Sequence, residues 1–252
     1  LWAGAHAVWL TRFSPEAFLQ TIARERATIA MGVPTFYHRL LPHLHTADLR
    51  SIRLLTSGSA PLPADTWRRI AQLTGHRVVE RYGMTELGMA LSNPYMGERR
   101  PGHVGQPLPA VVVKRVDESG TEVVDPATPG ELAVRSPTVF REYWGDPEAT
   151  RAAFSDGWFL TGDIAVREDG AYRILGRASI DIIKSGGYKL SALEIEATLL
   201  EHPSVTEVAV IGVPDDEWGE IVAAAIVLDA PTEEAALIAF SREKMSGYKV
   251  PR

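Results

Sequence analysis

The chain has 252 residues, of which 45% are hydrophobic and 23% charged, which is typical of a globular protein with one or two domains. A formal net charge of −6 argues against a nucleic-acid-binding surface, which would need a basic face. The absence of cysteine excludes a thiol nucleophile, a disulfide framework and thiolate metal sites, and no apolar run approaches the length of a membrane span. These features are compatible with a cytoplasmic protein. Both ends read as the middle of an element, so we expect a longer chain around them.

The first third of the sequence alternates predicted helices with short apolar strands. Ser14 followed by Pro15 is a typical helix start, with a capping hydroxyl and a proline in the first turn, and it predicts a helix over 15–26. A buried strand is predicted over 29–33. The further predicted elements are a helix over 34–41, a strand over 52–55, a helix over 64–73 and a strand at 76–79. This alternation predicts a mostly parallel α/β sheet.

Two other patterns follow. Residues 93–109 are rich in Gly and Pro and are predicted loops, and the short strands after them predict a small antiparallel barrel or sheet. From about residue 180 the pattern is that of a small α+β unit, whose first helix begins with a capping box at Ser191 and Glu194 and has an apolar stripe. The predicted strands are 111–113, 123–124, 131–134, 171–175, 205–213 and 221–228, the last helix spans 232–244, and the stripe comprises Leu193, Ile195, Leu199 and Leu200.

Two segments in the first half combine glycine with hydroxyl or acidic side chains. Residues 57–62 form a glycine-containing loop at the carboxyl end of a strand, where open α/β sheets bind ligands, although an ordinary strand-to-helix turn is an alternative. In residues 80–86 the hydroxyl of Thr85 and the carboxylate of Glu86 stand side by side, as suits Mg²⁺ shared with phosphates. The alternative there is a strand, a turn and a helix start. No dinucleotide fingerprint or P-loop pattern occurs anywhere, so those two interpretations fail.

Two segments in the second half carry similar chemistry. Asp163 follows a predicted strand and a glycine, where an acid can accept hydrogen bonds from both hydroxyls of a ribose, and a capping or turn aspartate is the alternative. Arg177 is suited to planar or phosphate contacts. Further on, Gly186 and Gly187 allow the backbone to bend or to approach a ligand closely.

Together, and in this order, the four segments resemble the adenylate-forming superfamily of acyl-CoA synthetases, luciferases and peptide-synthetase adenylation domains. The resemblance covers nearly the whole chain. It implies an α/β fold with a large N-terminal domain, here residues 1–180, and a small mobile α+β C-terminal domain, here residues 181–252, both incomplete. It also implies that ATP activates a carboxylate as an acyl-AMP and that the acyl group is then transferred to the thiol of coenzyme A. The family's phosphate loop and terminal lysine are expected outside the two ends.

The resemblance also implies roles for individual residues. The loop beside adenine would consist of Gly58, Ser59, Ala60 and Pro61, and the strip beside adenine and the acyl group of Tyr82, Gly83 and Met84. The phosphate and Mg²⁺ would meet Thr85 and Glu86, with Glu86 as the metal ligand, and the ribose would meet Asp163 and Arg177. The hinge would be Asp181, and the loop presented for the second step would hold Lys184, Gly186 and Gly187. Thr85, Glu86 and Lys184 are thus the expected catalytic residues.

Arg81 indicates which carboxylic acid the protein would activate. A long fatty acid would need apolar walls beside the strip, where a buried unpaired guanidinium is costly, whereas the second carboxylate of a dicarboxylate would pair with it. Residues 80–86, 92–95 and 97–102 resemble malonyl-CoA synthetases in particular, so we expect malonate, with methylmalonate as a second candidate, and no nucleic-acid or membrane partner. Three alternatives stay open: Arg81 pairs with Glu80 or another acid and only holds the loop, the acceptor is a carrier-protein thiol, or the chain is a non-catalytic nucleotide-binding homologue.

Overall fold

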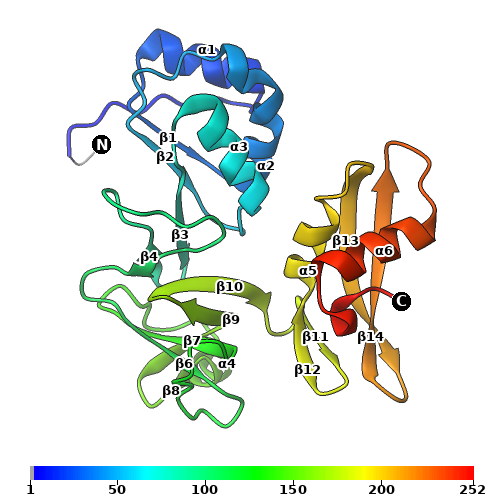
Figure 1. Ribbon diagram of the computed structural model, residues 1–252. Helices are drawn as coiled ribbons and strands as arrows, with labels where there is room; N and C mark the ends of the chain where they lie inside the picture. Colours follow the sequence, from blue (N-terminus) through cyan, green and yellow to red (C-terminus); the bar gives the residue numbers. More distant parts are fainter. Residues whose placement is uncertain (1–2) are drawn as a thin grey trace. The chain divides into compact units, whose positions relative to one another are not determined.

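The computed structural model describes residues 3–252 and is shown in Figure 1. The expected N-terminal element includes Leu1 and Trp2, which lie outside the described residues, and residues 5–10 are neither helical nor extended in a sheet. The chain forms two compact units: one holds the residues up to Met84 together with Leu91–Gln106, and the other holds Thr85–Ala90 together with Pro107–Arg252. The expected division after residue 180 falls inside the second unit and stays a proposal.

Parallel strands and helices alternate in the first unit, as predicted. Strand β1 pairs in parallel with β2, and β2 pairs in parallel with β3. The sheet has the strand order β1-β2-β3-β4-β5. The elements are α1 (Pro15–Glu25), β1 (Ile29–Gly32), α2 (Pro34–Leu40), the 3-10 helix η1 (Leu41–Thr46), β2 (Leu54–Ser57), α3 (Ala64–Thr74) and β3 (Val79–Met84), whereas β4 (Gly88–Ser92) and β5 (Gln106–Pro107) each have residues in both units.

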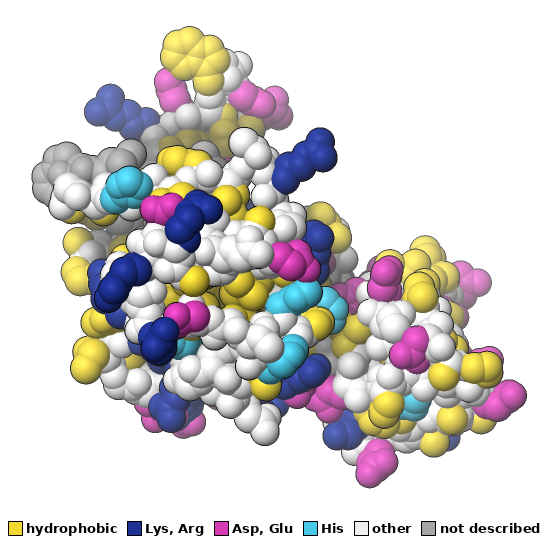
Figure 2. All heavy atoms as spheres, turned by 90° about the horizontal axis from the view of Figure 1, so that it is seen from above, with side chains coloured by type: hydrophobic (Ala, Val, Ile, Leu, Met, Phe, Trp, Pro, Cys, Tyr) yellow, Lys and Arg dark blue, Asp and Glu magenta, His cyan; other side chains and the backbone are white. Residues whose placement is uncertain are grey.

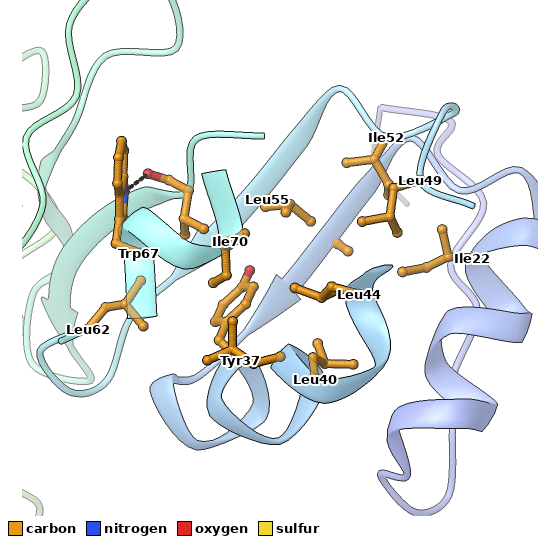
Figure 3. Packing of buried hydrophobic residues seen from close by; sticks show 13 residues of the cluster. Ile22, Tyr37, Leu40, Leu44, Leu49, Ile52, Leu55, Leu62, Trp67 and Ile70 are labelled. Carbon is orange, nitrogen blue, oxygen red and sulfur yellow. Dashed lines mark hydrogen bonds between the residues drawn. The ribbon is translucent and has the colours of Figure 1, made fainter. Parts of the chain in front are cut away.

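Local chemistry explains the start of α1, and apolar packing stabilises the first unit. The Oγ of Ser14 accepts a hydrogen bond from the amide of Ala17 at 3.1 Å, which confirms the predicted cap of α1. In the core drawn in Figure 3, the Trp67 Nε1 donates to the Val78 carbonyl at 2.9 Å. Ile70 of α3 is 1% exposed, and burying a side chain of this size contributes about 1.5–3 kcal/mol. This core supports the strand ends where the first two candidate segments lie.

Three predictions for the first unit need correction. Strand β1 is present but is not buried, since it is the outermost strand of the sheet and Met31 is 63% exposed. The second predicted strand begins at Leu54 rather than Ile52. Residues 80–86 are not a strand, a turn and a helix start, because β3 continues through Gly83 to Met84 and a turn then leads into β4.

The second unit contains the predicted antiparallel sheet, with strand order β10-β9-β7-β6 and β8 paired with β9. Its elements are β6 (Val112–Val116), β7 (Gly130–Arg135), α4 (Pro147–Ala152), β8 (Phe154–Ser155), β9 (Trp158–Glu168) and β10 (Ala171–Arg177). The strand predicted at 123–124 is wrong: Val124 is 82% exposed, and only an isolated bridge joins Val116 to Glu122. The strand predicted before Asp163 is present as the start of β9, but β9 continues to Glu168 and so places Asp163 inside a strand rather than after one.

The remainder of the second unit contains the predicted helices and two strands, and its sheet, of order β12-β11-β14-β13 and covered by α5, has two further strands, β11 and β12, that were not predicted. Ser191 caps α5 by accepting from the Glu194 amide at 3.1 Å, and Ile195 and Leu199 are buried as predicted. Leu200 is 41% exposed and does not belong to the stripe. The elements are β11 (Ile182–Ser185), β12 (Tyr188–Ser191), α5 (Ala192–Leu199), β13 (Val205–Asp215), β14 (Gly219–Leu228), α6 (Glu234–Lys244) and the 3-10 helix η2 (Gly247–Lys249). Within residues 3–252, every helix is too short or too polar to cross a lipid bilayer.

Candidate functional site

In the first unit, the loop after β2 lies directly against β3. A Cβ placed on Gly58 would come within 3.3 Å of the Arg81 carbonyl oxygen and 3.6 Å of its Cγ, so glycine allows this close approach. The next three residues of the loop are exposed, namely Ser59, Ala60 and Pro61. The structure therefore brings the first predicted segment beside the second and leaves the loop accessible to a ligand.

Strand β3 sorts its side chains onto two faces. Successive residues of a strand point to opposite sides, so Glu80 and Tyr82 share one face, and Arg81 and Gly83 share the other. Burial raises the pKa of the Tyr37 phenol, and the positive charge of Arg81 partly opposes this rise. Arg81 to Met84 are half-buried.

Glu80 fastens β3 to two loops. Its Oε1 accepts a hydrogen bond from the Gly102 amide at 2.9 Å, and its carboxyl also accepts one from the Leu62 amide. Burial raises the pKa of Glu80 to about 8 despite these bonds. Because its known partners are backbone amides on the face away from Arg81, this arrangement disfavours the interpretation that Arg81 serves mainly to pair with Glu80.

In the second unit, Thr85 and Glu86 occupy the turn that precedes β4. Thr85 is exposed and Glu86 is half-buried. The phenol of Tyr143 donates a hydrogen bond to the Glu86 Oε1 at 3.1 Å. Burial is the first cause that raises the pKa of Tyr143, followed by the hydrogen bond and the charge of Glu86, while Arg177 lowers it.

Asp163 and Arg177 are directly paired residues of β9 and β10. The Arg177 Nε lies 3.4 Å from the Asp163 Oδ1, and Asp163 is 7% exposed. Gly162 has a φ of +75°, and a Cβ there would lie 3.1 Å from a guanidinium nitrogen of Arg177, so glycine makes room for the guanidinium. The Gly162 amide also donates to the Glu131 Oε1 at 2.8 Å, which fixes the backbone beside Asp163.

These contacts join the predicted residues of the second unit into one cluster. Asp163 pairs with Arg177, the charge of Arg177 acts on Tyr143, and Tyr143 bonds to Glu86. The Arg177 amide further donates to the Asp181 Oδ2 at 2.8 Å, which brings the expected hinge residue to the same strand end. Tyr143 and Glu131 were missed from the sequence, since neither lies in a recognisable motif.

The expected loop of the second step is the hairpin between β11 and β12. Gly186 and Gly187 have φ values of +56° and +82°, as a tight two-residue hairpin turn requires. A Cβ on Gly186 would come within 2.8 Å of the Trp218 ring, and the Gly186 amide donates to the Trp218 carbonyl at 2.8 Å. The ammonium of Lys184 lies 3.4 Å from the carboxylate of Glu118.

Charged side chains of both signs lie on the surface of the protein (Figure 2). On the face drawn in Figure 2, basic and acidic side chains are interspersed among apolar ones. Among residues 3–252, three or more His, Asp or Glu side chains are nowhere grouped closely enough to hold a metal ion alone. A single carboxylate such as Glu86 is nevertheless compatible with Mg²⁺, which usually takes most of its ligands from substrate phosphates and water.

Two family models match the chain. The model described as AMP-binding enzyme matches residues 1–144, and the model described as AMP-binding enzyme C-terminal domain matches residues 194–252. The chain belongs to the AMP-binding enzyme family. This confirms the predicted α/β fold class, with an N-terminal domain and a small C-terminal domain, and the resemblance to adenylate-forming enzymes.

Individual relatives show which members of the family the chain is similar to. The chain is 46% identical over 290 residues to malonate–CoA ligase ACSF3, mitochondrial, of Bos taurus, covering 100% of this chain and 49% of that protein. It is 44% identical over 249 residues to malonate–CoA ligase of Arabidopsis thaliana, covering 89% and 40%. The crystal structure of ATP-bound MatB from Rhodopseudomonas palustris matches with a TM-score of 0.89 and 44% identity, over 97% of this chain and 49% of that one. The chain spans about half the length of the curated relatives it matches.

Proposed function

We propose that the protein activates malonate with ATP and transfers the malonyl group to coenzyme A. The observation that carries this proposal is a chain of interactions in the second unit. Asp163 forms an ion pair with Arg177, the charge of Arg177 acts on Tyr143, and Tyr143 donates a hydrogen bond to Glu86. These interactions connect Asp163, which can accept hydrogen bonds from ribose hydroxyls, with Glu86, whose carboxylate can ligate Mg²⁺ beside the phosphates. A bound ATP would require both groups. The names of the malonate–CoA ligases that the chain resembles support the choice of acid and acceptor.

The proposed reaction has two steps. A carboxylate oxygen of malonate attacks the α-phosphorus of ATP, the bond to the β-phosphate oxygen breaks, and pyrophosphate leaves. The sulfur of coenzyme A then attacks the acyl carbon, AMP leaves, and the thiol proton passes to solvent. A chain without cysteine suits this scheme, because the acceptor supplies the thiol and catalysis depends on positioning and charge neutralisation.

We assign the nucleotide contacts as follows. Asp163 would accept hydrogen bonds from the ribose hydroxyls, with Arg177 holding its carboxylate in place at 3.4 Å. Gly58 to Pro61, together with Tyr82, Gly83 and Met84, would line adenine and the acyl group. Thr85 and Glu86 would contact phosphate and Mg²⁺, and bound Mg²⁺ would neutralise negative charge on the phosphates.

Arg81 is the proposed partner of the far carboxylate of malonate, and methylmalonate would present the same group. A hydrogen bond between two charged groups contributes enough that Arg81→Ala should lower kcat/KM for malonate about 10- to 100-fold. The loss for acetate, which has no second carboxylate, should be several-fold smaller. Arg77→Ala removes another arginine near the same strand and serves as the control. Equal losses on malonate and acetate would remove the assignment of Arg81.

The direct test of the proposed function uses the intact protein. Malonate-dependent exchange of labelled pyrophosphate into ATP measures the first step, and formation of malonyl-CoA measures the second. Acylation of a carrier protein in place of free coenzyme A would favour an adenylation domain instead. Absence of both exchange and thioester would favour a non-catalytic nucleotide-binding homologue and refute the proposal.

We also propose that residues 1–180 and 181–252 act as a large and a small domain joined at Asp181. In support, a turn between β10 and β11 carries Asp181, and Ile180 beside it is 77% exposed. The hairpin with Lys184, Gly186 and Gly187 would act in the thioester step, so Lys184→Ala should slow that step and spare pyrophosphate exchange. Asp181→Pro restricts the backbone at the proposed hinge, so it should also slow the thioester step more than pyrophosphate exchange.

A cytoplasmic location is part of the same proposal. The animal relatives carry the word mitochondrial in their names, whereas the Arabidopsis thaliana relative does not. Cell fractionation followed by immunodetection of the intact protein distinguishes the two compartments, and recovery with mitochondria would contradict the cytoplasmic assignment.

A further inference from the structure

Tyr143 contacts the side chain of Glu86, and the sequence did not lead us to expect this contact. Its phenol donates to the Glu86 Oε1 at 3.1 Å, over a separation of 57 residues in the chain. The same segment also secures the backbone of the turn, because the Phe140 amide donates to the Glu86 carbonyl at 2.7 Å. The Thr138 hydroxyl donates to the Leu87 carbonyl, also at 2.7 Å. Glu86 is thus held by residues 138–143 through both its backbone and its side chain.

Tyr143 is itself firmly supported. Its amide donates to the hydroxyl of Thr150 in α4 at 3.0 Å, and its ring packs against Phe140 with the centroids 4.7 Å apart. Phe140 in turn packs against Phe154 and Phe159 with centroid distances of 5.6 and 5.4 Å. A hydroxyl presented from such a packed platform fixes the carboxylate at little further entropic cost.

The chemistry of a phenol suits this task. A neutral hydroxyl occupies one lone pair of the carboxylate oxygen and leaves the negative charge in place, so the other lone pairs can still face a cation. A lysine or arginine in this position would neutralise the carboxylate and compete with a metal ion. Carboxylates that ligate metals are usually held by such a hydrogen bond, and its loss typically costs about 10- to 100-fold in metal affinity.

We propose that Tyr143 is a positioning residue that orients the carboxylate of Glu86 toward the metal ion of the bound metal–ATP complex. This inference rests on the proposed function, because it takes Glu86 as the group that meets Mg²⁺. It adds a residue outside the four predicted segments. Tyr143 donates a hydrogen bond to Glu86, and the charge of Arg177 also acts on its phenol. The same side chain therefore connects the proposed metal ligand with the proposed ribose-binding pair.

The test measures binding rather than turnover, with the intact protein and the variant Tyr143→Phe. Calorimetry gives the affinity for ATP with saturating Mn²⁺ and, separately, for ATP in EDTA. Tyr143→Phe should weaken metal–ATP binding about 10- to 100-fold and leave metal-free ATP binding within about twofold. The matched control is Tyr172→Phe, which removes a phenol that donates to the Val113 carbonyl in the antiparallel sheet of the same unit, and it should change neither affinity.

A double-mutant comparison separates positioning from folding. On the Glu86→Gln background, Tyr143→Phe should cause no further loss of metal–ATP binding, because the carboxylate it orients is gone. Equal weakening with and without metal, or an unchanged metal–ATP affinity, would overturn the inference while leaving the proposed function intact. Failure of the unmodified protein to bind ATP at all would refute the proposed function and this inference with it.

Discussion

The buried carboxyl of Glu80 should make the stability of the first unit depend on pH. Glu80 is 3% exposed, and burial raises its pKa from 4.5 to about 8 even though it accepts hydrogen bonds from Gly102 and Leu62. The folded chain therefore keeps a proton that the unfolded chain loses near pH 4.5. The stabilisation from this proton is complete below pH 4.5 and is lost as the pH rises to about 8.

The size of the effect follows from that interval. Each pH unit between the two pKa values corresponds to about 1.4 kcal/mol, so the free energy of unfolding should fall by about 5 kcal/mol from pH 4.5 to pH 8 through this group alone. Glu80→Gln has nearly the same shape, keeps an acceptor oxygen for the Gly102 amide and has no proton to lose. As the pH rises across this range, the unmodified protein should therefore lose stability relative to Glu80→Gln.

Urea unfolding followed by circular dichroism at pH 5, 6, 7 and 8 measures the difference. Native-state hydrogen exchange of the Leu62 and Gly102 amides reports the same effect locally. The control Glu98→Gln changes an exposed glutamate of the same unit and should leave the pH dependence as it is. Parallel curves for Glu80→Gln and the unmodified protein from pH 5 to pH 8 would show that burial does not raise the pKa of Glu80, and the reasoning would fail.

Three further substitutions test individual contacts that the structure shows or that the proposed function implies. Gly105→Ala would place a Cβ onto the Ser92 carbonyl at a φ of +83°, so we expect a loss of about 3 kcal/mol or more in thermal unfolding, and an unchanged melting temperature would refute this. Arg115→Met leaves four carbonyls of residues 123–128 without their guanidinium donor, and urea unfolding should show a loss of about 1–3 kcal/mol, whereas an unchanged free energy of unfolding would contradict it. Asp163→Asn should weaken AMP binding about tenfold in calorimetry because it removes a charged acceptor, and equal affinity would count against its ribose contact.

The parts of the fold that depend on local chemistry could be predicted from the sequence. A capping hydroxyl at Ser14 and another at Ser191 marked two helix starts correctly, because the cap bonds reach only three residues along the chain. The parallel sheet followed from the alternation of short apolar runs with helices. The family and its four segments were also predictable, because each segment is contiguous in the sequence.

What the sequence could not supply depends on distant partners. A strand, a turn and a helix start were one interpretation of residues 80–86, but β3 runs through Gly83 to Met84 because strand pairing outweighs the weak preference of one glycine. Asp163 looked like a residue after a strand, whereas pairing with β7 and β10 extends β9 to Glu168. Tyr143 lies in an irregular segment, and no local pattern reveals that it meets Glu86 57 residues earlier.

The close packing of Gly186 against Trp218 gives the hairpin of Lys184 a built-in optical reporter. The indole ring lies under the turn, and the guanidinium of Arg252 lies 4.4 Å above the ring centroid. Any rearrangement of this turn must alter the surroundings of the indole, and with them its emission spectrum. A variant that keeps Trp218 as its sole tryptophan would turn the hairpin's motion into a fluorescence signal, with no dye attached to the chain.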